Sequence, residues 1–310
     1  MKYLVTGGAG FIGSNLVERL LSQGHEITVL DNLSTGYEKN ISNFLDQIQF
    51  YNKSIEEFDF LEIGKLDAVI HLAAQASVPL SVENFEESSS SNILGTIKII
   101  SFCKSNKIPL VYASSSAIYG DLDIGNDSEN NIDLLTPYSA DKYLMEVYTD
   151  VAFKNYDMSS IGLRFFNVYG PKQDPKSPYS GVISIFVEKH IQQESITIFG
   201  GHQTRDFVYV GDVVNCIIRS IELVIKNKIC EIVNVLTGKS ISIDDLANKI
   251  SEISEYQPKK IYATLPAGDP EKSEGTTKKM VDLLKLTISE FIEIEEGLKD
   301  TFLHIKKDDN

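Results

Sequence analysis

The sequence predicts an α/β protein, with a doubly wound parallel sheet and a smaller α/β domain toward the C-terminus. Short apolar stretches alternate with helix-period stretches along most of the chain. Near-continuous apolar strands of this kind are typical of a parallel sheet that is covered on both faces. A glycine-rich turn, Gly7-x-x-Gly10-x-x-Gly13, joins the first apolar strand to the first helix, as in Rossmann-type folds.

The elements of the first half follow this alternation in order. The expected strands are Lys2–Thr6, Glu26–Leu30, Ile48–Tyr51, Asp67–Leu72, Leu110–Ala113 and Ser160–Phe165. Helices are expected after the glycine turn, at about Asn92–Cys103 and at about Tyr138–Tyr156.

Beyond about Asn167, prolines and the Gly200-Gly201 pair break the pattern into shorter elements. Helical and strand-like patterning returns over residues 207–234. We therefore expect a first domain over residues 1–166, rejoined by about 207–235. A second, smaller domain is expected over residues 167–206 and 236–305.

Composition limits the class of protein. The chain has 310 residues, of which 42% are hydrophobic, so it can bury a core without a metal or disulfide staple. Its net charge of −15 repels nucleic acid and anionic membranes. Cys103, Cys216 and Cys230 have neither disulfide-framework nor zinc-site spacing. With no leader-like or membrane-spanning stretch, we expect a cytoplasmic protein that binds no metal, membrane or nucleic acid.

The glycine turn predicts a dinucleotide site. Glycines let the backbone approach a pyrophosphate, and the helix that follows offers free N–H donors at its N-terminus. Asp31 ends the second strand and is expected to bind the adenosine ribose, which favours NAD over NADP; alternatively, it caps a turn. The predicted contacts of this half of the cofactor are Gly7, Gly10, Phe11, Ile12, Gly13, Asp31, Asn32 and Ser34.

The pair Tyr138-x-x-x-Lys142 predicts a proton-transfer site, because residues four apart share one face of a helix. A free tyrosine, with a pKa near 10, is a poor base at neutral pH. A neighbouring ammonium and a cationic nicotinamide ring are expected to lower that pKa. A serine of Ser114-Ser115-Ser116 is placed to share the proton.

These motifs, with others, carry a family resemblance. The segments are TGGAGFIGSNL, LDNLSTG, HLAAQASVPLS, NILGT, ASSSAIYGD, PYSADK, RFFNVYGP, TRDFVYVGDV, NVLTGKSISI and AGDPEKS. The chain resembles the extended short-chain dehydrogenases/reductases of the NAD-dependent epimerase/dehydratase family. Within the family it is most similar to the UDP-glucose and UDP-N-acetylglucosamine 4-epimerases.

The resemblance implies roles for further residues. Tyr138, Lys142 and Ser115 would be catalytic, and Asn92 would support the site from the helix after the fourth strand. Further cofactor contacts are implied for Ser54, Ile55, Leu72, Ala73, Ala74, Asn92, Tyr138 and Lys142. Contacts with the sugar nucleotide are implied for Ser77, Ser115, Ser116, Asn167, Val182, Arg205, Asp269 and Ser273. For Arg205 the alternative is a salt bridge with Asp206 or another acid.

Three departures from the family pattern bear on the substrate. Ser116 and Ala117 stand where dehydratases carry carboxylates, so loss of water is not expected. Pro266 replaces an arginine that grips the diphosphate in the epimerases, and Ser54 replaces an acid that binds the adenine. Ser273 is small where glucose-restricted enzymes carry a tyrosine, which leaves room for an N-acetyl group.

The resulting hypothesis is a homodimeric enzyme that inverts C4 of a nucleotide sugar, UDP-N-acetylglucosamine or UDP-glucose, through a 4-keto intermediate with NAD retained. Two alternatives within the same chemistry stay open. One is a UDP-glucuronate 4-epimerase, and the other is a nucleotide-sugar 4-reductase or dehydrogenase that releases its cofactor. A non-catalytic NAD sensor is the alternative from another class, but a sensor does not need Ser115, Tyr138 and Lys142.

Overall fold

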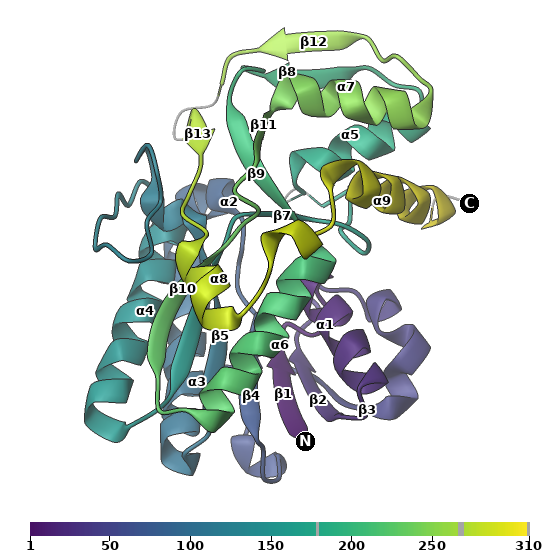
Figure 1. Cartoon of the computed structure of the whole chain (residues 1–310). Helices are drawn as coiled ribbons and strands as arrows, with labels where there is room; N and C mark the ends of the chain where they lie inside the picture. The colour runs from purple at the N-terminus through teal and green to yellow at the C-terminus, as the bar shows by residue number, and fades with distance from the viewer. Residues whose placement is uncertain (178–179, 266–269, 309–310) are drawn as a thin grey trace. The chain divides into compact units, whose positions relative to one another are not determined.

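The computed structural model describes residues 1–177, 180–265 and 270–308. The chain divides into two compact units (Figure 1), which are described separately below. The first comprises Met1–Ile118, Leu134–Arg164 and Val214–Val233. The second comprises Tyr119–Asp133, Phe165–Val213 and the chain from Asn234 onward.

The first unit is built on a sheet in which seven strands of the described chain follow the order β10-β6-β5-β4-β1-β2-β3. Their bounds are β1 Lys2–Thr6, β2 Glu26–Asp31, β3 Ile48–Asn52, β4 Ala68–His71, β5 Leu110–Ser115, β6 Ser160–Phe165 and β10 Cys230–Val235. The pairs β1–β2, β2–β3, β1–β4 and β4–β5 are parallel. The order reverses between β1 and β4, which confirms the predicted doubly wound Rossmann fold.

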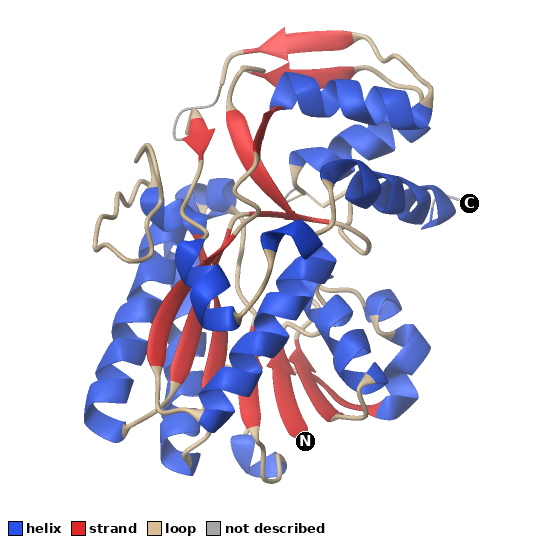
Figure 2. Ribbon diagram, viewed as in Figure 1, coloured by secondary structure: helices blue, strands red, loops and turns tan. Residues whose placement is uncertain are grey.

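Helices flank this sheet (Figures 1 and 2). They are α1 Phe11–Ser22, α2 Val78–Glu83, α3 Phe85–Asn106, α4 Pro137–Tyr156 and α6 Val210–Lys226, the last starting in the second unit. A continuous apolar core joins the strands to α3 and α4, with Leu4, Val69 and Leu110 packed near Cys103 and Met145. Cys103 is fully buried in this core, and burial raises the pKa of its thiol.

The second unit contains two smaller sheets. One follows the order β11-β9-β13 with β7 also paired to β9, and the other pairs β12 with β8. The strands are β7 Asn167–Tyr169, β8 Ile196–Phe199, β9 Thr204–Tyr209, β11 Ser240–Ser242, β12 Lys260–Ala263 and β13 Lys272–Ser273. The helices are α5 Val182–Ile191, α7 Ile243–Ser254, α8 Lys278–Leu284 and α9 Ile294–Asp308. The apolar faces of α5, α7 and α9 meet in one core.

Two features differ from the sequence-based expectations. Helix α3 begins at Phe85 rather than near Asn92. The prediction started too late because the residues before Asn92 are mostly serines, which are weak helix formers, yet they are helical in the structure. Residues 119–133 and 207–213, expected in the first domain, belong to the second unit. Two hydrogen bonds of Asn234 hold residues 119–133 in that unit. The Asn234 side-chain carbonyl accepts from the Tyr119 hydroxyl at 2.7 Å, and the Asn234 backbone N–H donates to the Asp127 carboxylate at 2.7 Å.

Candidate active site

The glycine turn between β1 and α1 fits a dinucleotide. Gly7 has a φ of +72°, and a Cβ there would come within 2.6 Å of the Ala73 nitrogen. A Cβ on Gly13 would overlap the carbonyl oxygen of Gly7. Gly10 is the N-cap of α1 and provides no side-chain cap, so the first-turn N–H groups beside Phe11 and Ile12 stay available for an anion.

Asp31 lies at the C-terminal end of β2 and faces this turn. Its carboxylate accepts the N–H groups of Ala9 at 2.9 Å and Leu33 at 2.8 Å. Burial raises the pKa of Asp31, and these hydrogen bonds work against that rise. An ionised carboxylate offers about four acceptor positions, so capping the turn leaves capacity for ribose hydroxyls. Asn32 and Ser34 follow in an exposed turn, where Asn32 accepts the Ser34 N–H at 3.1 Å.

The other predicted cofactor contacts follow β3 and β4. Leu72 donates its N–H to the Thr6 carbonyl at 3.1 Å, so the chain of Leu72, Ala73 and Ala74 leaves β4 beside the end of β1. This is the point where the strand order reverses, at which open α/β sheets bind ligands. Ser54 accepts the Glu57 N–H at 3.3 Å, and Ile55 packs into the core, so Ile55 could reach a cofactor only through its backbone.

Helix α4 carries the predicted proton-transfer pair. Thr136 caps the helix in a reciprocal capping box with Ser139, which fixes where its first turn starts. Tyr138 and Lys142 are both buried, and the Lys142 ammonium lies 5.7 Å from the centroid of the Tyr138 ring. Ser115, at the end of β5, lies where its hydroxyl can hydrogen-bond Tyr138 and lower its pKa, and Lys142 donates to the carbonyl of Ala113 at 2.8 Å.

Burial has the largest effect on the protonation of this pair. Burial raises the pKa of Tyr138; the Ser115 hydrogen bond lowers it and Asp141 raises it again. Burial also lowers the pKa of Lys142 to about 8, against the opposing effect of Asp141. In the protein without cofactor, desolvation of the buried phenolate outweighs its hydrogen bond, and the expected lowering of the tyrosine pKa, which also relies on the nicotinamide charge, stays a prediction.

Asn92, on α3, joins the loop after β4 to helix α4. Its side-chain oxygen accepts the Gln75 N–H at 2.8 Å, and its amide nitrogen donates to Asp141 at 3.1 Å. Gln75 in turn donates to the carbonyl of Ser77 at 3.1 Å, and Ser77 caps α2 through the Leu80 N–H at 3.2 Å. Asp141 was not predicted, although its position three residues after Tyr138 on one helix could have revealed it.

Three residues predicted to bind the sugar nucleotide meet in the second unit, around β9. Asn167 opens β7 and Ser273 ends β13, and both strands run parallel to β9. The Asn167 amide donates to the Asp206 carbonyl at 3.0 Å and to the Ser273 hydroxyl at 3.4 Å. Ser273 is paired in register with Arg205, which is buried and donates to the Thr204 carbonyl at 2.8 Å.

The Asp206 carboxylate is engaged elsewhere in the same unit. It accepts the N–H groups of Thr237 at 2.8 Å and Gly238 at 2.7 Å. Neighbouring side chains of a strand point to opposite faces, so Arg205 and Asp206 are poorly placed to pair. Val182 is the first residue of α5 and packs partly into the core of this unit. Asp269 and Pro266 lie outside the described residues.

Residues 3–235 match the NAD dependent epimerase/dehydratase family. The chain belongs to this family.

Relatives and solved structures agree with that membership. A putative UDP-glucose 4-epimerase of Methanocaldococcus jannaschii is 41% identical over 266 residues, 84% of each chain. The structure of a Thermotoga maritima UDP-glucose 4-epimerase with UDP-glucose matches with a TM-score of 0.93 and 32% identity over 100% of both chains. A Methanobrevibacter ruminantium UDP-N-acetylglucosamine 4-epimerase matches with a TM-score of 0.93 and 33% identity, over 99% and 98% of the two chains. A Bacillus cereus UDP-glucuronic acid 4-epimerase matches with a TM-score of 0.90 and 29% identity, over 99% of both.

In this member of the epimerase/dehydratase family, neither of the two residues after Ser115 carries a carboxylate. Ser116 begins the short 3₁₀ helix η4 (Ser116–Tyr119), and the Ala117 N–H donates to the Ser115 hydroxyl at 3.1 Å. Neither side chain can act as the acid that would expel a hydroxyl group as water.

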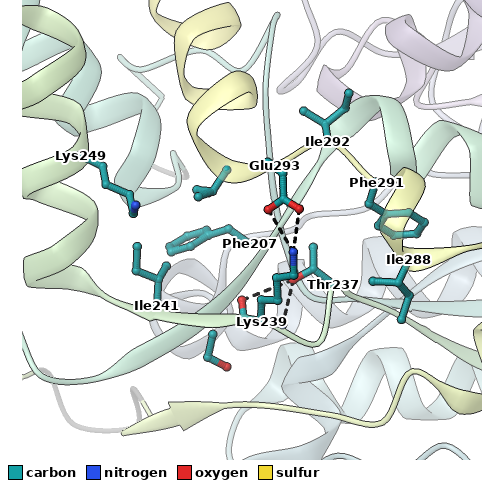
Figure 3. A pocket seen from close by; sticks show the side chains of 11 residues that line it. Phe207, Thr237, Lys239, Ile241, Lys249, Ile288, Phe291, Ile292 and Glu293 are labelled. Atoms are coloured by element: carbon teal, nitrogen blue, oxygen red, sulfur yellow. Dashed lines mark hydrogen bonds and ion pairs between the residues drawn. The ribbon is translucent and has the colours of Figure 1, made fainter.

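A cavity of about 280 Å³ lies in the second unit beside β9 (Figure 3). Its lining consists of Phe207, Thr237, Lys239, Ser240, Ile241, Lys249, Ile288, Phe291, Ile292, Glu293 and Ile294. Glu293 pairs with Lys239 at 2.7 Å and 3.0 Å, and Lys249 pairs with Glu295. Both lysines are thus neutralised and the remaining wall is largely apolar, so this cavity is a poor site for a diphosphate.

Two features are absent from residues 1–177, 180–265 and 270–308. No helix there combines the length and apolar character needed to span a bilayer. No group of three or more His, Cys, Asp and Glu side chains gathers there in a way that could hold a metal ion.

Proposed function

We propose that this chain is an NAD-dependent 4-epimerase of a nucleotide sugar, with UDP-N-acetylglucosamine or UDP-glucose as its substrate. The observation that carries the proposal is the placement of Ser115, Tyr138 and Lys142 on β5 and α4. In the same unit, the glycine turn and Asp31 fit a dinucleotide. Membership of the epimerase/dehydratase family and similarity to epimerases of both sugars support it.

The proposed roles divide between the two units. The first unit would hold NAD through the glycine turn and Asp31, and Lys142 would hold the nicotinamide ribose. The second unit would hold the sugar nucleotide, with Arg205 on the diphosphate and Asn167 beside it. A charged, buried arginine suits that task because its fork of N–H donors matches phosphate oxygens.

The reaction uses the tyrosine as base and acid in turn. Tyr138, as phenolate, removes the proton of the 4-hydroxyl group, and Ser115 relays that proton through its hydrogen bond with Tyr138. NAD, held by the glycine turn, Asp31 and Lys142, would supply the acceptor and donor for the C4 hydride, and return of that hydride to the opposite face would invert C4. Tyr138 then returns its proton to the new hydroxyl group, and the cofactor is regenerated in every cycle.

The small side chain of Ser273 favours acceptance of an N-acetyl group. The Ser273 hydroxyl lies against the Asn167 amide, and a tyrosine at this position would fill more space. UDP-glucuronate remains the second candidate substrate, since a UDP-glucuronic acid 4-epimerase is also similar in structure.

We further propose that the enzyme is a cytoplasmic homodimer. Large apolar side chains are exposed on two neighbouring helices of the first unit: Leu94 and Ile97 on α3, and Val147, Tyr148 and Val151 on α4. A second copy of α3 and α4 would cover them in a four-helix interface. Among the described residues no disulfide joins the three cysteines, which agrees with a reducing compartment.

The proposed activity is tested by proton NMR of the purified protein with each of three UDP-sugars, without added cofactor. We expect UDP-N-acetylglucosamine or UDP-glucose to give a galacto-configured product, since the NAD stays bound. Turnover of UDP-glucuronate alone would favour the second substrate. Turnover that requires added NAD or NADH would indicate a reductase or dehydrogenase, and no turnover in any arm would contradict the proposal.

A further inference from the structure

Three residues of α4, spaced four apart, face the end of strand β5. Tyr138 lies beside the Ser115 hydroxyl, Lys142 donates to the Ala113 carbonyl at 2.8 Å, and Glu146 accepts from the Ser114 hydroxyl at 2.5 Å. The first two contacts belong to the proposed reaction. The third involves a buried carboxylate that the reaction does not use.

Glu146 is held on both of its oxygens. Oε1 accepts from Ser114 and from Nε of Arg164 at 2.8 Å, and Oε2 accepts from Nη2 of Arg164 at 2.6 Å. Glu146 is 6% exposed, Arg164 5% and Ser114 2%. The three residues come from α4, β6 and β5, so the cluster joins the catalytic helix to two neighbouring strands.

A buried ion pair is a poor choice for stability alone. Removing both charges from water costs about as much as their attraction returns, and a well-packed apolar pair is often as stable. The pair instead fixes the orientation of the Glu146 carboxylate. Charge-assisted hydrogen bonds are short and strong, and the two N–H donors of the Arg164 guanidinium hold the plane of the carboxylate. The Ser114 hydroxyl therefore donates to a rigid acceptor. On β5, Ser114 lies between Ala113, which contacts Lys142, and Ser115, which contacts Tyr138.

We propose that Glu146 and Arg164, through Ser114, position the end of β5 against the catalytic helix. By holding Ser114, they set where the Ser115 hydroxyl meets Tyr138 and where the Ala113 carbonyl meets Lys142. Glu146 and Arg164 are positioning residues, because they act through Ser114. The inference rests on the proposed function, since it assigns Tyr138 as the base.

The same pair of elements offers a matched control. The Tyr112 hydroxyl bonds with the Thr149 hydroxyl at 2.8 Å, again between β5 and α4 and again buried. Tyr112 and Ser114 are two residues apart and share a face of β5. Tyr112→Phe therefore removes one buried β5–α4 hydrogen bond farther from Tyr138, whereas Ser114→Ala removes the one that adjoins Ser115.

The test compares wild type, Ser114→Ala and Tyr112→Phe for kcat, KM, the pH profile of kcat and the melting temperature. Asp141 and Lys142 on α4 lie near Tyr138, and His71 on β4 interacts with Lys142; both variants keep all three groups. We expect Ser114→Ala to lose roughly ten- to hundredfold in kcat with little change in KM. Its pH profile should shift to higher pH, because the Ser115 hydrogen bond that lowers the pKa of Tyr138 is loosened. Tyr112→Phe should lose melting temperature but keep kcat and its pH profile.

An unchanged kcat and pH profile in Ser114→Ala, or an equal loss of kcat in Tyr112→Phe, would overturn the inference. Glu146→Gln is a second variant, but it leaves the Arg164 charge buried without its counter-charge and so risks unfolding.

A readout independent of turnover separates this inference from the proposed function. In ¹³C-tyrosine NMR of the holoenzyme, with the Tyr138 signal assigned from Tyr138→Phe, Ser114→Ala should raise the pKa of Tyr138. If wild type is inactive on all sugars, the proposed function fails, while an unshifted Tyr138 titration contradicts the positioning role itself.

Discussion

In the proposed reaction, Tyr138 must lose its proton near neutral pH in surroundings that favour the neutral phenol. Burial is the largest influence on its pKa and raises it, whereas the hydrogen bond from Ser115 is the one contact that lowers it. The Lys142 pKa of about 8 leaves that amine mostly charged at pH 7. A cationic nicotinamide ring would add the second positive charge, so we infer that Tyr138 becomes a competent base only in the holoenzyme.

Replacing Tyr138 with phenylalanine tests this role directly. Tyr138→Phe keeps the ring and its packing but removes the proton acceptor, so we expect kcat to fall about 10²- to 10⁴-fold with NAD still bound. Tyr156→Phe, at the last residue of the same helix and 56% exposed, is the matched control and should keep kcat. Near-normal turnover in Tyr138→Phe would exclude it as the base.

Ser273 gives a residue-scale prediction about specificity. A tyrosine at this position would crowd the space beside Asn167, so Ser273→Tyr should lower kcat/KM for UDP-N-acetylglucosamine about 10- to 100-fold more than for UDP-glucose. Ser273→Ala, which is also small, should keep the wild-type ratio. The ratio of the two kcat/KM values is the measurement, and a ratio unchanged by the tyrosine would remove Ser273 from the specificity site.

At the scale of an element, the β1–α1 turn depends on the absence of side chains. A Cβ on Gly13 would overlap the Gly7 carbonyl, whereas a Cβ on Gly64 would meet nothing within 4 Å. Gly13→Ala should therefore deform the turn and abolish NAD retention, while Gly64→Ala should retain it. The NAD content of the purified variants, measured after denaturation, checks this. Full NAD retention in Gly13→Ala would show that the turn is not the pyrophosphate site.

The elements that the sequence predicted well are those whose signal is local. The strands Lys2–Thr6 and Ser160–Phe165 are apolar runs and lie where they were predicted. Membership of 119–133 in the second unit depends on hydrogen bonds to Asn234, more than 100 residues later, and no local pattern encodes such a pairing.

The same limit applies to the site. Tyr138, Lys142 and Ser115 have recognisable spacing, and the structure brings them together. Asp141 and Glu146 lie on the same helix, but an acid on a helix normally faces water, so burial is visible only once α3, β5 and β6 are in place.

For the whole molecule, buried titratable groups make stability depend on pH in opposing directions. Burial lowers the pKa of His71 to about 3, with Lys142 adding to the effect. Since its ordinary pKa is 6.5, the unfolded chain binds more protons between pH 6.5 and 3, and stability falls as pH falls through that window. Asp212 acts oppositely: burial raises its pKa from 3.8 to about 6, so the folded chain binds more protons and gains stability as pH falls from 6 to 3.8.

The contribution of His71 can be isolated from that background by substitution. His71→Gln removes the titrating group and disturbs its contacts with Thr6 and Thr96, so it should lower the free energy of unfolding at every pH.

The informative quantity is the slope of the free energy of unfolding against pH. Wild type should lose up to about 1.4 kcal/mol per pH unit more than the variant as pH falls from 6.5 toward 4.5. Urea denaturation across that range at one fixed NAD concentration measures it, because bound ligand adds stability of its own. Parallel curves for wild type and His71→Gln would mean that the folded protein accommodates a protonated His71, which would contradict the sealed, neutral environment between β1, β4 and α3.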